Sequence, residues 1–241
     1  MKGMLSCILI LSSIFMAGCI SNPPKEQLQK YVQGQVFETL FPIANHEVPL
    51  PEGKWKFISV RFTSNDVGQS FANLHLLKTD DVTFTDGVFI RSSLNNSGSN
   101  GFVQSRFCER SNILFAKVFV NERGADQDCW GINYFRTTRG KNTDQASLDA
   151  LEYIKANKIK RPNFAVYTQH RLTENNSFLM VQYYSNPEYY TDIAPVPMTS
   201  WDASEWHTDL YYRDSKKEEY IEKLKLIGSE RHENLKLGGF Y

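Results

Sequence analysis

The sequence predicts an α+β fold in which a mostly antiparallel β-sheet carries flanking helices and one disulfide. Aromatic and β-branched runs joined by turn-forming residues predict the sheet. Segments between them, with capping residues and apolar residues at helical spacing, predict the helices. A separated pair of cysteines, Cys108 and Cys129, predicts the disulfide.

Five aromatic and β-branched runs are the principal predicted strands. They span residues 54–62, 113–120, 130–134, 164–172 and 178–184. In the first run the apolar positions change sides between Phe57 and Ile58, which indicates a buried or bulged strand. The second run is apolar on both faces apart from Lys117, so we expect a central strand covered on both sides. Only polar residues separate the last two runs, which predicts a hairpin.

A further hairpin is predicted at Asp86-Gly87, because this pair supplies the positive φ angles of a tight type I′ turn. Strand-like residues flank the pair at 82–85 and 88–90. The following stretch, 95–101, consists almost entirely of Asn, Ser and Gly and predicts a loop.

Four segments carry the signals of helices. They are expected over 27–37, from Asn142 toward Pro162, from Asp202, and from Ser215. In the last three, Gln or Glu follows the capping residue three positions later, as in a capping box. Gly34 weakens the first helix, and Gly228 is a candidate interruption of the last.

The N-terminal residues have the order of features that an export signal needs. Lys2 supplies a positive charge, residues 5–15 are mostly apolar, and Met16-Ala17-Gly18 precede Cys19. This apolar run is shorter than the roughly 20 residues of a membrane-spanning helix, which argues against an uncleaved transmembrane segment. The residues around Cys19 resemble the lipobox of bacterial lipoproteins, although that pattern prefers Leu where this chain has Met16.

The resemblance covers only the first 20 or so residues and implies where in the cell the protein is located. It implies that residues 1–18 are a signal peptide and that Cys19 is lipidated. The consecutive prolines Pro23 and Pro24 favour an extended backbone, so residues 19–24 are expected to form a lipidated tether. Residues 25–241 are then expected to form one domain on the membrane surface. Ile20, in place of an Asp-type retention signal, implies the outer membrane, facing the periplasm, in a Gram-negative cell. Several acyl chains anchor a protein stably to a membrane where one does not.

The charge balance argues against nucleic acid as a partner. The chain has 27 basic and 27 acidic side chains, and removal of the signal would take away only the basic Lys2. A nucleic-acid binder needs an excess of basic residues to replace the counterions of phosphate.

The cysteines agree with export. Cys7 falls within the predicted signal and Cys19 at its end, so Cys108 and Cys129 remain. In an oxidising compartment these two cysteines are expected to form a disulfide. For a closed loop of this length, such a bridge stabilises the folded state by about 3 kcal/mol. A metal site or a redox pair is the alternative. No Cys-x-x-Cys or His-x-x-x-His accompanies the pair, so no metal site is predicted.

Catalytic signals are weak. The common motifs for nucleophilic serine, phosphate, dinucleotide and zinc chemistry are absent from the sequence, and we predict no cofactor. His170 falls on the same predicted strand face as Phe164 and Leu172, and Glu174 follows it. The two are candidates for a buried base and its carboxylate. The plainer alternative is a histidine that only forms hydrogen bonds within the fold.

Aromatic residues are concentrated after residue 182, and exposed ones can stack on sugars or anchor a protein contact. The candidate binding residues are Tyr189, Tyr190, Trp201 and Tyr212. Most of the aromatic residues in this stretch are nevertheless expected to fill the core between sheet and helices, because large aromatic side chains are usually buried.

Two functional classes follow. The first is a non-catalytic envelope lipoprotein that binds another envelope protein, a glycan or a lipid. The alternative is a lipid-anchored periplasmic hydrolase that uses His170 with a carboxylate such as Glu174.

Overall fold

The computed structural model describes residues 24–66, 68–94, 101–124, 126–138, 140, 143–174 and 176–239. The predicted signal peptide, Cys19 and most of the predicted tether lie outside these described residues, as do Asn142 and residues 95–100. In the part of the chain that the structure describes, no helix is long and apolar enough to cross a membrane.

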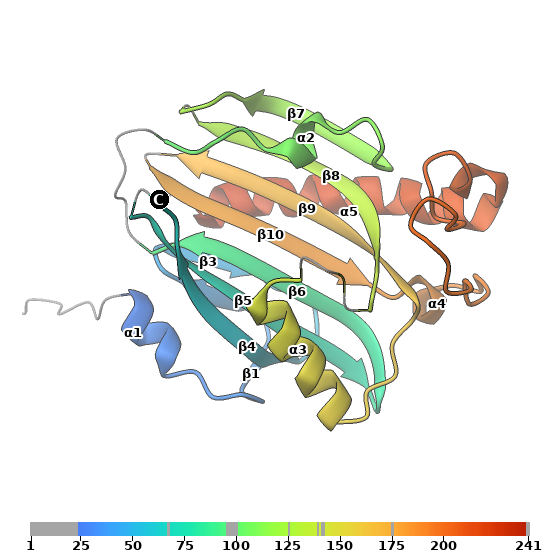
Figure 1. Ribbon diagram of the computed structural model, residues 1–241, viewed down its shortest axis with the longest axis horizontal. Coiled ribbons are helices and arrows are strands. Elements are labelled where there is room, and N and C mark those ends of the chain that lie inside the picture. Colours follow the sequence, from blue (N-terminus) through green and yellow to red (C-terminus); the bar gives the residue numbers. More distant parts are fainter. Residues whose placement is uncertain are drawn as a thin grey trace, which may run out of the picture.

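An eight-stranded antiparallel sheet forms the centre of the molecule (Figure 1). Its strand order is β1-β4-β5-β6-β10-β9-β8-β7. The strands, in the same order, are Val36–Phe37, Trp55–Ser64, Ser70–Asp80, Thr83–Ser93, Ser177–Ser185, Phe164–Glu174, Gln127–Arg136 and Phe115–Asn121. Two meanders, β4-β5-β6 and β7-β8-β9-β10, meet where β6 pairs with β10. The predicted α+β class is confirmed.

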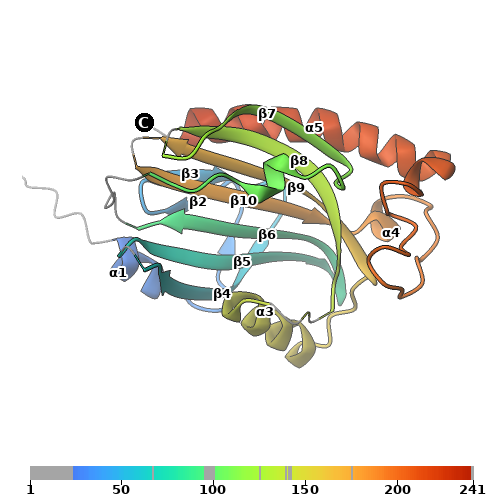
Figure 2. The same cartoon turned by 45° about the horizontal axis from the view of Figure 1, so that its top comes forward.

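The helices and a small hairpin cover the two faces of this sheet (Figures 1 and 2). The helices are α1 (Pro24–Gln29), α2 (Arg106–Glu109), α3 (Gln145–Ala156), α4 (Pro187–Tyr190), the 3-10 helix η1 (Tyr211–Arg213) and α5 (Ser215–Gly239). The hairpin consists of β2 (Leu40–Ile43) and β3 (His46–Pro49). We call the face under α5 and the hairpin the α5 face. The opposite face, which carries α2 and α3, is the α3 face.

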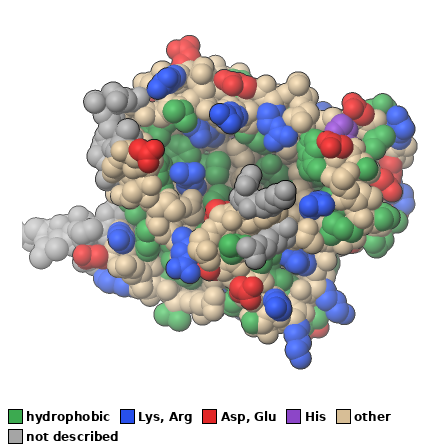
Figure 3. All heavy atoms as spheres, in the orientation of Figure 1, with side chains coloured by type: hydrophobic (Ala, Val, Ile, Leu, Met, Phe, Trp, Pro, Cys, Tyr) green, Lys and Arg blue, Asp and Glu red, His purple; other side chains and the backbone are tan. Residues whose placement is uncertain are grey.

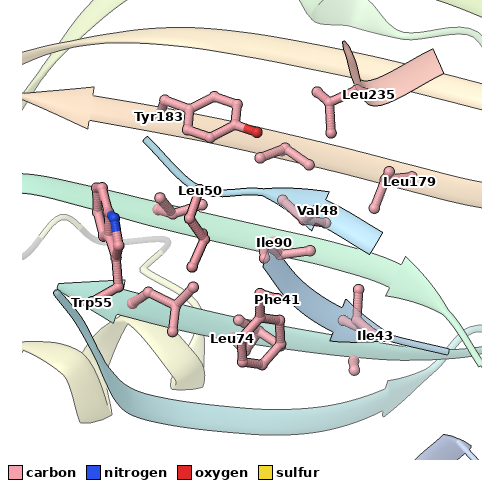
Figure 4. Close-up of a cluster of buried hydrophobic side chains, with 14 of the residues drawn as sticks. Phe41, Ile43, Val48, Leu50, Trp55, Leu74, Ile90, Leu179, Tyr183 and Leu235 are labelled. Carbon is pink, nitrogen blue, oxygen red and sulfur yellow. The ribbon is translucent and has the colours of Figure 1, made fainter. Parts of the chain in front are cut away.

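The larger hydrophobic core lies on the α5 face, between the sheet and the β2-β3 hairpin (Figure 4). Leu74, Ile90 and Val181 stand side by side on β5, β6 and β10 because the strand register aligns them. The hairpin contributes Phe41 and Val48, both fully buried. Burial of one such side chain stabilises the fold by about 1.5–3 kcal/mol, so this cluster fixes the hairpin onto the sheet.

A second core lies under α5, where Ile221 and Leu224 pack with Trp130 and Ile132 of β8. The expected interruption at Gly228 does not occur, and α5 continues to Gly239. A Cβ atom on Gly228 would lie 2.4 Å from Cζ3 of Trp130. The glycine therefore permits close approach of the helix to the sheet rather than a break.

The bulge predicted in the first strand is present: the register between β4 and β5 shifts between Phe57 and Ser59. The hairpin predicted at Asp86-Gly87 is wrong, because both residues lie within β6. The turn falls instead between β5 and β6, where Asp81 has a φ of 49°. Gly87 lies close to the neighbouring strand, where a Cβ would be in tight contact with Tyr184, 3.1 Å from its Cδ2.

The run 113–120 is not a central strand. It forms β7, the outermost strand next to β8, and Val118 and Phe119 are each 46% exposed. The periodicity of a strand indicates which residues share a face of the sheet. It does not indicate whether another strand pairs with each of its two edges. Lys117 fits an edge, where a charge discourages pairing with another chain. The predicted 164–172/178–184 hairpin is confirmed as β9-β10.

The predicted helix ends are partly wrong. The first helix stops at Gln29, and β1 occupies Val36–Phe37 instead. The cap of α3 is Asp144, whose side chain accepts the Ser147 N–H. From Asp202 the chain makes successive turns rather than the predicted helix. The final helix is present from Ser215, as predicted.

The disulfide between Cys108 and Cys129 is present, with the two Cα atoms 6.3 Å apart. Cys108 belongs to α2 and Cys129 to β8. The bridge therefore fastens the segment around α2 to the α3 face of the sheet.

Candidate functional site

The candidate site is a cavity on the α3 face, formed because the chain leaves the sheet between β8 and β9. Between these two strands lies α3, which packs on β4 and β5 of the other meander, so the connection crosses this face of the sheet. The returning chain is fixed to β6: Phe84 N–H donates to Lys160 O at 2.8 Å. The cavity between this crossover and the sheet has a volume of about 520 Å³. That volume lies in the range of small-molecule sites.

Hydrophobic side chains form most of the cavity wall. They come from the sheet and from α3, and include Ile58, Leu77, Phe84, Phe135, Leu151 and Ile154. Trp201, from the segment after α4, completes the aromatic part of the wall and stacks on Tyr134 with ring centroids 5.1 Å apart. Figure 3 shows this face, with hydrophobic side chains in its hollowed middle and Lys and Arg side chains around them. A ligand in the cavity would bury largely apolar surface.

One wall carries a hydrogen-bonded chain of His75, Ser147 and Asp144. The Ser147 hydroxyl donates to Asp144 Oδ2 at 2.6 Å. The His75 Nε2 atom lies 3.1 Å from the same hydroxyl oxygen. An ionised carboxylate only accepts hydrogen bonds, so the single O–H of Ser147 is donated to Asp144. The Ser147 oxygen is then the acceptor toward His75, whose Nε2–H is the donor.

This assignment determines the chemistry of His75. Burial lowers the pKa of the His75 imidazole to about 4, against the opposing effect of Asp144 and Asp149. The ring is therefore neutral near pH 7. With its proton on Nε2, His75 does not remove the proton of Ser147, so this trio does not activate a nucleophile as arranged. It offers Nδ1 as a hydrogen-bond acceptor instead.

The sheet side of the cavity bears neutral polar groups. The Tyr184 hydroxyl donates to Gln182 Oε1, and the Gln182 amide donates to Gln169 Oε1 at 2.6 Å. Burial raises the pKa of Tyr167 to about 12 and that of Tyr184 well above its ordinary value, so both phenols stay protonated. These groups can orient a ligand through hydrogen bonds without requiring a charge on it.

His170 lies on the other face of the sheet, under α5, and is 1% exposed. Its Nδ1 atom is 3.3 Å from Nδ1 of His232, and its Nε2 atom is 3.0 Å from Thr168 Oγ1. His232 Nε2 in turn lies 2.6 Å from Asp128 Oδ1. The carboxylate nearest to His170 along this chain is thus Asp128, which the sequence did not single out.

Proton positions in this second chain follow from Asp128. The carboxylate accepts from His232 Nε2–H, which leaves His232 Nδ1 to accept from Nδ1–H of His170. The Thr168 hydroxyl then donates to His170 Nε2. Every position is satisfied with both imidazoles neutral, and Lys236 Nζ donates to the other oxygen of Asp128 at 2.9 Å. Burial is the main cause that lowers the pKa of His170 well below its ordinary value, and the charge of Arg231, or of His232 when that ring is protonated, acts in the same direction.

The other predicted site residues are dispersed. Glu174 is exposed at the end of β9 and makes no hydrogen bond with His170 among the described contacts. Tyr189 donates to Asp80 and Tyr190 to Asp86. Tyr212 is 52% exposed on η1. Of the four predicted binding aromatics, only Trp201 lines the cavity.

Sequence reasoning missed His75, Ser147 and Asp144. Asp144 and Ser147 carry a local signal, that of a capping residue with a partner three positions later, but this signal indicates a helix start and not a site. His75 lies 72 residues away from Ser147 along the chain, so no spacing could have linked them.

In the described part of the chain, no group of three or more His, Cys, Asp or Glu side chains is arranged to hold a metal ion. Comparisons with known protein families, curated proteins and solved structures find no match to this chain.

Proposed function

We propose that this protein is an exported, lipid-anchored binding module that holds a small, largely apolar molecule in the cavity under the crossover. The observation that carries the proposal is the cavity itself: about 520 Å³, with hydrophobic walls and hydrogen-bonding groups on the sheet side. Sites for small molecules combine these features, since apolar burial supplies affinity and a few polar groups set orientation.

Binding is favoured over catalysis by the direction of the hydrogen bonds. The Ser147 hydroxyl donates to Asp144, and the imidazole beside it is neutral and donates rather than accepts. A serine nucleophile needs the opposite arrangement, in which an imidazole accepts the hydroxyl proton. The neutral phenols and amides of Tyr167, Tyr184 and Gln182 fit recognition of ligand hydroxyl, carbonyl or amide groups.

The cellular location in this proposal rests on the resemblance of the N-terminal residues to a lipobox. A protein held at the outer membrane by lipid on Cys19 would present the cavity within reach of envelope molecules. Mass spectrometry of the native protein tests this part. We expect a chain that starts at acylated Cys19, and an intact Met1 would contradict it.

Binding is tested with the fluorescent probe 8-anilinonaphthalene-1-sulfonate. The full chain would be placed in phosphatidylcholine nanodiscs, with the signal of empty discs subtracted. We expect saturable binding of one probe per chain. Leu151→Trp, which fills part of the cavity, should weaken probe binding about tenfold or more, since an overpacked cavity excludes its ligand.

The matched control is Lys155→Trp, which places the same side chain at an exposed position of α3. It should leave probe affinity unchanged. Absence of saturable binding, or equal affinity of the Leu151→Trp and Lys155→Trp variants, would contradict the proposal.

A further inference from the structure

A second feature of the α3 face is a pair of arginines without carboxylate partners. Arg91 of β6 and Arg171 of β9 flank Met180 of β10 in the strand register. Both side chains therefore project from the same face of the sheet, two strands apart, at roughly 10 Å between backbones. They lie one register row beyond Gln182, which belongs to the cavity wall.

The phenylalanine rings beneath these arginines hold the guanidinium groups. The Arg91 guanidinium lies 4.6 Å from the ring centroid of Phe71, and the Arg171 guanidinium lies 4.8 Å from that of Phe178. The Arg91 guanidinium also lies 6.0 Å from the Phe178 centroid, so the two groups share one ring. Stacking of this kind orients the planar group and leaves its N–H edge available for hydrogen bonds.

The hydrogen bonds of the pair are incomplete. Arg171 Nε donates to Gln127 Oε1 at 2.6 Å, and its Nη2 donates to Val103 O at 2.7 Å. Arg91 makes no such bonds, and its Nε atom is buried without a hydrogen-bond partner among the described residues. A buried donor without an acceptor is uncommon in folded proteins because its desolvation is not offset.

Neither arginine has an ion pair. All Asp and Glu residues of the sequence belong to the described part of the chain. None of them has a carboxylate oxygen within 4.0 Å of a guanidinium nitrogen of Arg91 or Arg171. Arg61, in the same register row on β4, differs because it pairs with Asp149. Burial and the nearby charge of Arg91 lower the pKa of Arg171 to about 10. Two half-buried positive charges are thus held near each other with no carboxylate at ion-pair distance. The charge of Asp144 acts on Arg91 only from beyond that distance, and burial outweighs it, so the pKa of Arg91 is lowered.

We propose that Arg91 and Arg171 bind an oxyanion, a phosphate or a carboxylate group, between them on the α3 face. The anion would accept from the free N–H groups of both side chains. Arg favours such groups because its forked donors match two oxygens at once. This site is separate from the cavity of the proposed function, so each can fail without the other.

Isothermal titration calorimetry of the full chain tests the proposal, with inorganic phosphate and acetate as free anions at constant ionic strength. A second arm measures binding to phosphatidylglycerol vesicles against phosphatidylcholine vesicles. We expect saturable binding of one anion per chain in at least one arm. Binding of phosphate or acetate alone identifies a free anion. Binding confined to phosphatidylglycerol vesicles identifies a lipid headgroup.

Arg91→Gln and Arg171→Gln should each weaken this binding about tenfold or more, the effect of losing one hydrogen bond to a charged group. Arg61→Gln is the matched control, since it removes the same charge from the same register row. It should leave binding unchanged. Arg91→Lys keeps the charge but lacks the fork, and should weaken binding several-fold.

Three results would overturn the proposal. One is the absence of saturable binding in every arm, as expected if the arginines only stack on Phe71 and Phe178. Another is an equal loss of affinity in the Arg61, Arg91 and Arg171 variants, which would indicate net charge alone. The third is unchanged affinity in Arg91→Lys, and this test still applies if the glutamine variants fail to fold.

Discussion

Gly228 is the position in α5 where packing and helix propensity oppose each other. In the interior of a helix, replacing Gly by Ala ordinarily stabilises a protein by about 1 kcal/mol. At Gly228 the new Cβ would lie 2.4 Å from Cζ3 of Trp130 and 3.1 Å from two neighbouring ring atoms. Real Cβ atoms essentially never approach a heavy atom as closely as 2.4 Å. The helix or the indole must therefore move.

The expected magnitude follows from these two effects. Overpacking in a close-packed core costs about 1–3 kcal/mol, and three short contacts with a rigid ring place Gly228→Ala at the upper end. After the gain in propensity, we expect a net loss of about 2 kcal/mol. For a chain of this size, that lowers Tm by roughly 4–8 °C.

The assay is urea unfolding of Gly228→Ala, followed by circular dichroism and Trp fluorescence. Asn234→Ala is the control, because Asn234 is exposed on the same helix. There the change to Ala should stabilise the protein by about 0.5 kcal/mol. Trp130→Phe in the Gly228→Ala background should recover part of the loss, because it shortens the ring. If Gly228→Ala is as stable as the unmodified protein, the packing argument for α5 is refuted.

Two further predictions concern the disulfide and His75. Replacing Cys108 and Cys129 by Ser should lower the free energy of unfolding by about 3 kcal/mol, because the bridge closes a loop of 21 residues. Thermal unfolding measures this loss. A reductant should reproduce the loss in the unmodified protein and leave the double variant unaffected. The pKa of His75 in the folded protein is about 4, below its value in the unfolded chain. The unfolded chain therefore binds a proton first as the pH falls. The free energy of unfolding should be unaffected by His75 above about pH 6.5 and should fall by roughly 3 kcal/mol as the pH drops to 4. His75→Gln should reduce that pH dependence in urea titrations, with the remainder due to His170, and an imidazole NMR titration midpoint of His75 near 6.5 would contradict the assignment.

Local chemistry was enough to predict several elements. The side-chain period of a strand is two, so the change of parity between Phe57 and Ile58 predicted a strand that is either buried on both faces or bulged, and the structure has the bulge. The β9-β10 hairpin was predicted because two aromatic and β-branched runs flank a short polar segment. In each case all of the interacting residues lie within a short stretch of chain.

Errors occurred where the same local pattern fits two environments. Asp86-Gly87 has the composition of a tight turn, yet Gly87 lies inside β6, where it pairs with Leu77 of β5 and Tyr184 of β10. The apolar run of β7 resembles a central strand, yet it is the edge of the sheet. Gly228 resembles a helix break, yet it faces Trp130. The deciding neighbour in each case comes from a distant part of the chain.

By itself, the sequence determined the α+β class, the β9-β10 hairpin, the cysteine pair and most of the last helix, because turn chemistry, periodicity and capping act over a few residues. Only the tertiary structure decided which face each helix covers and how the crossover encloses a cavity. It also decided which polar groups meet there. His75 and Ser147 become neighbours because α3 packs on β5. Arg91 and Arg171 become neighbours because both pair with Met180 of β10. Both contacts join residues far apart in the sequence, and no local preference encodes them.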